Sequence, residues 1–232
     1  MKKTLSVKMT RGETTLGWFY MVLQLLFLPT ALVLLNVNLR TPLDDVELNF
    51  LFFCLNFLWV TVIFRRYLLD CGKIALAAPG KCLKAAISGY FMYWGLSFVV
   101  SLFILSVYPE FNNVNDSAIE VMVDNNFALT AIGTILLVPV TEETLFRGLI
   151  FQGLHHKSRF WAYTVSAVAF CLPHVLGYIG LYSPLHLLLC FLQYLPAGIA
   201  LAWAYERSDS IWASVLLHTF VNLTGVAAMT AR

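Results

Sequence analysis

The sequence predicts an all-α membrane protein, a bundle of about seven transmembrane helices with its N-terminus in the cytoplasm. Of its 232 residues, 59% are hydrophobic and 12% are charged, whereas a soluble domain has roughly 25% charged residues. The mean hydropathy is +0.76. So few charges cannot cover a water-facing surface, which identifies an integral membrane protein. The net charge of +2 gives no indication of nucleic-acid binding.

Seven apolar runs approach the length that a bilayer requires, about 20 residues for a spanning helix. The second run is short, and the fourth qualifies only if a charged cluster is accepted inside the membrane. The expected spans are Leu16–Val37, Leu48–Phe64, Ala85–Tyr108, Phe127–Ile150, Phe160–Ile179, Pro184–Tyr205 and Ile211–Met229.

The charges between these runs predict the orientation, because Lys and Arg concentrate on the cytoplasmic side. Acidic residues dominate the first and third loops, and the third loop has no Lys or Arg. The basic residues are Lys2, Lys3, Lys8 and Arg11 in the tail, Arg65, Arg66, Lys73, Lys81 and Lys84 in the second loop, and Lys157 and Arg159 in the fourth. This alternation places the N-terminus in the cytoplasm and the C-terminus outside. The first run is too long for a typical cleaved signal peptide, so we interpret it as a retained helix.

We expect a single membrane domain with two parts. Residues 1–126 would form N-terminal transmembrane helices with a cytoplasmic tail, and residues 127–232 a catalytic core. The five cysteines form no C-x-x-C pair, so we expect free thiols. Pro139, Pro173 and Pro196 lie within spans, where each should kink its helix or free a carbonyl.

The stretch "EETLFRG" inserts Glu142, Glu143 and Arg147 into an apolar run. A buried carboxylate is costly unless it is paired, hydrated or protonated. Glu143 and Arg147 are four residues apart with the acid first, which favours an ion pair on one helix face. Glu142 points about 100° away. It therefore has no partner on its own helix.

Candidate partners for Glu142 lie in two later spans. "FCLPH" contains His174, and "HTFVN" contains His218 and Asn222 on one helix face. At 1.5 Å per residue, Glu142 lies roughly 12 Å and His218 roughly 11 Å from the cytoplasmic side. His174 would lie roughly 21 Å deep if its helix begins at Phe160. That depth conflicts with a common site unless the fifth helix starts later or bends at Pro173.

If these groups meet, two hydrolytic sites are possible. A glutamate and a histidine around one water form a general base, and a histidine and an asparagine can stabilise an oxyanion. Alternatively, Glu142, His174 and His218 would suit a catalytic zinc with water as the fourth ligand. The spacing leaves this choice open, and H-E-x-x-H is absent. Each feature also has a purely structural interpretation when it is considered alone. The ion pair between Glu143 and Arg147 would serve to hold helices together, and each histidine would be a hydrogen-bonded packing residue.

The three motifs resemble those of the CAAX-protease and bacteriocin-processing (CPBP) intramembrane proteases, also called the Abi family. "EETLFRG" is similar to the family's EExxxR motif, "FCLPH" to FxxxH and "HTFVN" to HxxxN, in the same order. The resemblance implies an endopeptidase whose site opens toward the cytoplasm. It implies that Glu142 activates water, that Glu143 and Arg147 occupy the other fixed positions of the first motif, and that His174, His218 and Asn222 complete the site. The family has been described both as metal-dependent and as glutamate-type.

Eukaryotic members of this family have a further span after the third motif, so this chain is more similar to small prokaryotic members. We therefore expect a protease of the prokaryotic plasma membrane that acts on a membrane peptide or protein near the cytoplasmic face. Glu142 and His174 would activate the water, while His218 and Asn222 would stabilise the oxyanion. A bacteriocin-immunity or scaffold protein remains an alternative. A third is a transporter that uses Glu142 as an ion site, although no internal repeat is visible.

Overall fold

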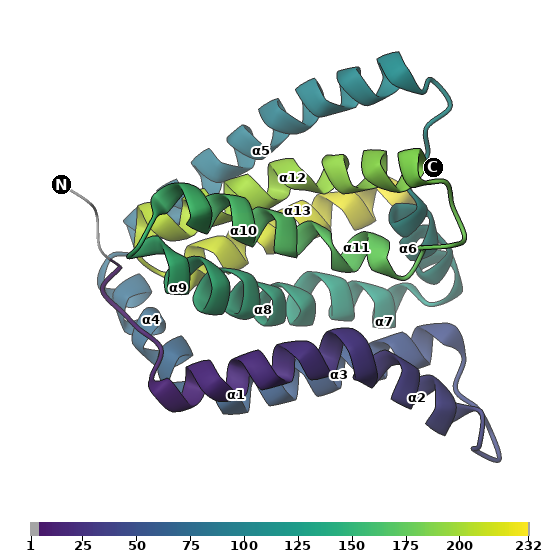
Figure 1. Ribbon diagram of the computed structural model, residues 1–232, viewed down its shortest axis with the longest axis horizontal. Helices are drawn as coiled ribbons and strands as arrows, with labels where there is room; N and C mark the ends of the chain where they lie inside the picture. The colour runs from purple at the N-terminus through teal and green to yellow at the C-terminus, as the bar shows by residue number, and fades with distance from the viewer. Residues whose placement is uncertain (1–4, 232) are drawn as a thin grey trace.

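The computed structural model describes residues 5–231 as a bundle of helices (Figure 1). Lys2 and Lys3 of the basic tail lie outside the described residues. The helices in chain order are α1 (Arg11–Val22), η1 (Leu23–Phe27), α2 (Leu28–Asn36), α3 (Asp45–Ile63), α4 (Arg65–Ala77), α5 (Pro79–Val107), α6 (Val114–Asn125), α7 (Phe127–Ala131), η2 (Ile132–Leu137), α8 (Val138–Glu143), η3 (Thr144–Phe151), α9 (Gln152–His155), α10 (Arg159–Cys171), α11 (Pro173–Leu176), α12 (Pro184–Ser208) and α13 (Ile211–Thr230), where η marks a π-helix. Residues 5–231 contain no strand, so the all-α prediction is confirmed.

Between residues 5 and 231, six continuous helical segments are long and apolar enough to cross a membrane: Arg11–Asn36, Asp45–Ile63, Pro79–Val107, Phe127–His155, Pro184–Ser208 and Ile211–Thr230. The expected fifth span is α10 followed by α11. A turn at Leu172 separates them, so neither is long enough alone. The pair runs along α12 (Figure 1). The arrangement agrees with about seven spans in a multi-pass membrane protein.

Side-chain caps fix where several of these passes begin. Thr10 and Glu13 form a capping box at the start of α1, with Oγ1 of Thr10 3.1 Å from the Glu13 nitrogen. Asp44 and Glu47 form a second box at the start of α3. Such caps satisfy backbone N–H groups that a helix start leaves without partners. Each box lies just before an apolar run, so the sequence specifies these starts locally.

Two segments expected as loops are short helices. The basic second loop contains α4, whose inward face buries Tyr67, Leu68 and Cys71. The acidic third loop contains α6, capped by the side chain of Asn113. In Figure 1, α4 and α6 lie at opposite ends of the bundle.

One apolar core joins both parts of the chain. Tyr20, Val60 and Tyr67 from the N-terminal half pack in the same cluster as Leu201 and Leu217. All five cysteines are free, as expected: Cys54, Cys71, Cys82, Cys171 and Cys190.

The helices α10 and α12 pack especially closely at Gly198. A Cβ atom on Gly198 would lie 3.0 Å from both Cα and Cβ of Ala167. Small residues allow such close backbone approach between transmembrane helices.

Candidate active site

The first motif lies on the fourth pass, where α8 carries the two glutamates between the π-helices η2 and η3. Pro139 in the first turn of α8 has no N–H to donate to the preceding turn. Helix α13 supplies hydrogen bonds there instead. Oγ1 of Thr219 donates to the Ile135 carbonyl at 3.1 Å, and Nδ2 of Asn222 donates to the Thr134 carbonyl at 2.7 Å. Because Pro139 leaves carbonyls of the preceding turn without a donor on their own helix, these carbonyls accept hydrogen bonds from α13, which connects the first motif to the third.

Glu143 is fully buried and paired, as the spacing predicts. Its Oε2 lies 3.2 Å from Nε of Arg147, which is also fully buried. Arg147 donates from Nη2 to the Gly198 carbonyl at 3.1 Å, and its guanidinium carbon lies 4.5 Å from the centroid of the Phe170 ring. The opposite charge of Glu143 and the hydrogen bond from Nη2 offset part of the cost of burial. Nε and Nη1 of Arg147 have no hydrogen-bond partner among the described residues.

Two side chains of α13 also bind Glu143. Nδ1 of His218 lies 2.9 Å from its Oε1, and the hydroxyl of Ser214 donates to its Oε2. Ser214 was missed in the sequence analysis, although it precedes His218 by four residues and therefore shares its helix face. Glu143 thus fixes the His218 ring and directs Nε2 away from itself, toward Glu142.

Glu142 has a different environment. Its Oε2 lies 4.0 Å from Nε2 of His218, and this buried oxygen has no hydrogen-bond partner among the described residues. Its side chain retains 22% exposure, whereas that of Glu143 has none. One carboxylate is therefore held by protein groups and the other faces open space. Oxygen atoms at such positions are candidates for binding water.

His174 reaches the same cavity despite its depth in a straight-helix estimate. Helix α10 ends at Cys171, and the chain restarts at Pro173 as the short α11. Nδ1 of His174 lies 3.0 Å from the Phe170 carbonyl, and its ring stacks on Tyr194 at a centroid distance of 4.1 Å. If Nδ1 carries the proton that this carbonyl accepts, the neutral ring leaves Nε2 as an acceptor. Tyr194 was also missed, and nothing in the sequence distinguishes it.

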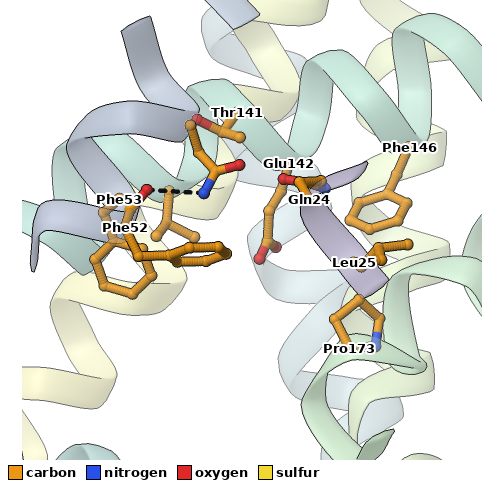
Figure 2. A pocket seen from close by; sticks show the side chains of 10 residues that line it. Gln24, Leu25, Phe52, Phe53, Thr141, Glu142, Phe146 and Pro173 are labelled. Atoms are coloured by element: carbon orange, nitrogen blue, oxygen red, sulfur yellow. Dashed lines mark hydrogen bonds between the residues drawn. The ribbon is translucent and has the colours of Figure 1, made fainter. Parts of the chain in front are cut away.

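A cavity of about 480 Å³ brings four of the six expected site residues together, since Glu142, His174, His218 and Asn222 all line it. Glu143 and Arg147 lie behind this wall, in the buried network. A second pocket of about 80 Å³ also reaches Glu142. In Figure 2 the Glu142 side chain projects between Phe52 and Phe53 on one side and Leu25 and Pro173 on the other.

The three candidate metal ligands are Glu142, His174 and His218. Within residues 5–231, no group of three or more His, Cys, Asp or Glu side chains is placed to hold a metal ion. Nδ1 of His218 is engaged by Glu143, and its Nε2 lies 4.0 Å from Glu142. Glu142, His174 and His218 therefore share a cavity without forming a ligand set.

Comparison with known proteins agrees with the three motifs. Residues 124–224 match the family model described as type II CAAX prenyl endopeptidase Rce1-like. This segment contains all six expected site residues, and the match agrees with the resemblance of the three motifs to the CPBP family.

Two curated relatives are similar to part of the chain. The UPF0177 protein YxdF of Lactococcus lactis is 32% identical over 94 residues, covering 40% of this chain and 46% of the relative. The "Putative membrane peptidase YdiL" of Bacillus subtilis is 27% identical over 147 residues, covering 62% and 54%. The matched region thus spans about half the length of each curated relative. No solved structure matches the chain significantly.

Proposed function

We propose that this protein is an intramembrane peptidase of the bacterial plasma membrane that hydrolyses a peptide bond of a membrane-associated peptide or protein. The observation that carries the proposal is the unpartnered Oε2 of Glu142, which faces His218 in a cavity shared with His174 and Asn222. A purely structural carboxylate in a membrane would be expected to have its hydrogen bonds satisfied, as those of Glu143 are. The family match and the printed name of the Bacillus relative support the same reaction class.

In the proposed mechanism, a water molecule bound at Glu142 attacks the carbonyl carbon of the substrate. Glu142 takes a proton from this water, and an acceptor Nε2 on His174 would help to orient it. The attack forms a tetrahedral oxyanion. Asn222 would stabilise it with an amide hydrogen, and His218 would do so from Nε2 when the ring is protonated on both nitrogens, since Nδ1 is engaged by Glu143. Collapse of this intermediate breaks the C–N bond. The proton held by Glu142 passes to the leaving amine, so that one water is consumed per bond cleaved.

Glu143 and Arg147 act indirectly in this scheme, as positioning residues. Glu143 accepts from Nδ1 of His218 and thereby fixes the ring orientation. Arg147 holds Glu143 in place and neutralises its charge. Second partners of this kind orient catalytic histidines in many enzymes.

The test compares the membrane and released peptides of cells that make the wild-type protein or Glu142→Gln at matched levels. We expect at least one peptide to be released by the wild type only, while both proteins melt at similar temperatures. Equal peptide profiles, with every candidate substrate expressed, would contradict the proposal and favour an immunity or scaffold role.

A metal requirement is tested separately by treating the purified protein with a strong chelator. The arrangement of Glu142, His174 and His218 supports the glutamate-type reaction, so we expect peptide release to survive the treatment. Loss of release that zinc restores would instead support the metal-dependent alternative.

A further inference from the structure

Two contacts hold His174 in the large cavity. Nδ1 lies 3.0 Å from the Phe170 carbonyl, and the ring stacks on Tyr194 of α12 with an angle of 28° between the ring planes. Helix α11, which carries His174, has only four residues and follows the turn at Leu172. A helix this short is not stable on its own. Because a single hydrogen bond lets a ring pivot about it, the orientation of His174 depends on Tyr194.

The Tyr194 hydroxyl is itself held by the first turn of α6. It donates to Oδ1 of Asp116 at 2.7 Å and accepts from Nδ2 of Asn115 at 3.0 Å. Its distance to Oδ1 of Asn113 is longer, 3.4 Å. A hydroxyl has one hydrogen to donate, and a hydrogen bond to a carboxylate is roughly twice as strong as one between neutral groups. The bond to Asp116 therefore determines where the hydroxyl lies.

Asn113 fixes the start of α6 against α12. This residue is buried, and its Oδ1 caps α6 by accepting from the backbone nitrogens of Asn115 and Asp116 at 3.0 and 3.3 Å. Its Nδ2 donates to Oε1 of Gln193, the neighbour of Tyr194, at 2.8 Å. Helix α6 thus binds two consecutive residues of α12, and it lies at the end of the bundle where α12 begins (Figure 1).

We infer that Tyr194 is a positioning residue for His174, and that α6 holds Tyr194 in place. This inference rests on the proposed peptidase function. The Tyr194 hydroxyl is bonded to α6 while its ring covers one face of the imidazole, so Tyr194 acts on the reaction through His174. A fixed ring directs Nε2 to one place in the cavity, where it would orient the water bound at Glu142. Asp116 and Asn115 precede residue 124, so a helix outside the segment that matches the family would complete the site.

The test compares variants that each remove one part of this arrangement. Tyr194→Phe keeps the stacked ring and removes the hydroxyl, whereas Tyr194→Leu removes the ring. Asp116→Asn keeps the shape of the acceptor and removes its charge. Tyr90→Phe is the matched control, because Tyr90 of α5 packs against Phe220 outside the cavity lining and its hydroxyl makes no hydrogen bond among residues 5–231.

The first readout is the rate of cleavage by the purified protein, with the peptide that only the wild type releases as the substrate. We expect the kcat of Tyr194→Phe to fall about 10- to 100-fold, as for other groups that orient a catalytic side chain, with KM and the melting temperature close to those of the wild type. The double variant Tyr194→Phe/Asp116→Asn should be no slower than Tyr194→Phe, because both changes remove the same hydrogen bond. A wild-type kcat for Tyr194→Phe, or a loss that lies in KM alone, would overturn the inference.

The second readout is the NMR spectrum of the protein with isotope-labelled histidine, which needs no activity. His174→Gln would identify the His174 signal. Because the imidazole lies over the Tyr194 ring, the ring current of the tyrosine should move its C–H protons upfield in the wild type. This shift should be lost in Tyr194→Leu, altered in Tyr194→Phe and Asp116→Asn, and unchanged in Tyr90→Phe. The same His174 signal in the wild type, Tyr194→Phe and Asp116→Asn would overturn the inference.

The peptidase proposal fails separately, if Glu142→Gln releases the same peptides as the wild type. The kinetic comparison would then have no substrate, and the His174 signal alone would decide whether α6 positions the ring through Tyr194.

Discussion

Removal of the Arg147 charge should show that the buried ion pair of the fourth pass stabilises the fold. Arg147→Met retains most of the apolar stem and leaves Glu143 charged, with only His218 and Ser214 as partners. Breaking a buried pair from one side costs about 3–5 kcal/mol, because a charge is left uncompensated. For a chain of this size, where 1 kcal/mol shifts Tm by about 2–4 °C, the expected decrease is roughly 6–20 °C.

The double variant Glu143→Gln/Arg147→Met provides the control. It removes both charges and keeps an amide that can bind His218, so most of the lost stability should return. Stability would be measured as the melting temperature and as the midpoint of a denaturing-detergent titration of the purified protein, with the fluorescence of its six tryptophans as the probe. A coupling energy of about 2 kcal/mol or more is expected from the cycle. A wild-type midpoint for Arg147→Met, or strictly additive losses in the double variant, would refute this reasoning.

Three further predictions concern helix packing, the N-terminal segment and the candidate site. Gly198→Ala should destabilise the fold by about 1–3 kcal/mol, because its Cβ meets α10, while Gly95→Ala, which meets nothing within 4 Å, should leave the unfolding midpoint unchanged or higher. Gln152 accepts a hydrogen bond from the Met9 nitrogen and donates one to the Val7 carbonyl. Gln152→Ala should therefore release the N-terminal segment and speed its cleavage by an added protease, without changing the melting temperature by more than a few degrees; unchanged cleavage would show that these bonds do not hold the segment. Asn222→Ala should slow peptide release by about 10²-fold or more if its amide stabilises the oxyanion, and a rate equal to wild type would remove Asn222 from the mechanism.

Much of the fold could be predicted because length and apolar content define a membrane span. The capping boxes at Thr10 and Asp44 are also readable, since their hydrogen bonds are local. The π-helices around α8 could not be predicted. A π-helix differs from an α-helix by a wider turn, with hydrogen bonds from i to i+5. The fourth pass is buried on most sides, so its hydrophobic pattern has no clear period from which the wider turn could be recognised.

The candidate site was predictable only in part. The spacing of Glu143 and Arg147 identified their ion pair, because partners four residues apart meet on any helix. The same reasoning assigned no inter-helix partner to Glu143, yet His218 and Ser214 bind it, since contacts between helices depend on their rotation and depth. The depth estimate for His174 assumed one straight helix from Phe160, whereas the chain turns at Leu172. This turn lies next to Pro173, where the sequence analysis allowed for a bend.

The small pocket beside Glu142 is lined by residues from both the matched and the unmatched part of the chain. The six expected site residues all lie within residues 124–224, the part that matches the family. The pocket, however, takes half of its lining from η1 and α3: Gln24, Leu25, Phe52, Phe53 and Asn56. If the proposed peptide hydrolysis takes place at Glu142, a substrate side chain that enters this pocket would contact residues outside the matched part. Exchanging the first two passes between two related proteins would then be expected to change substrate preference without altering the six site residues.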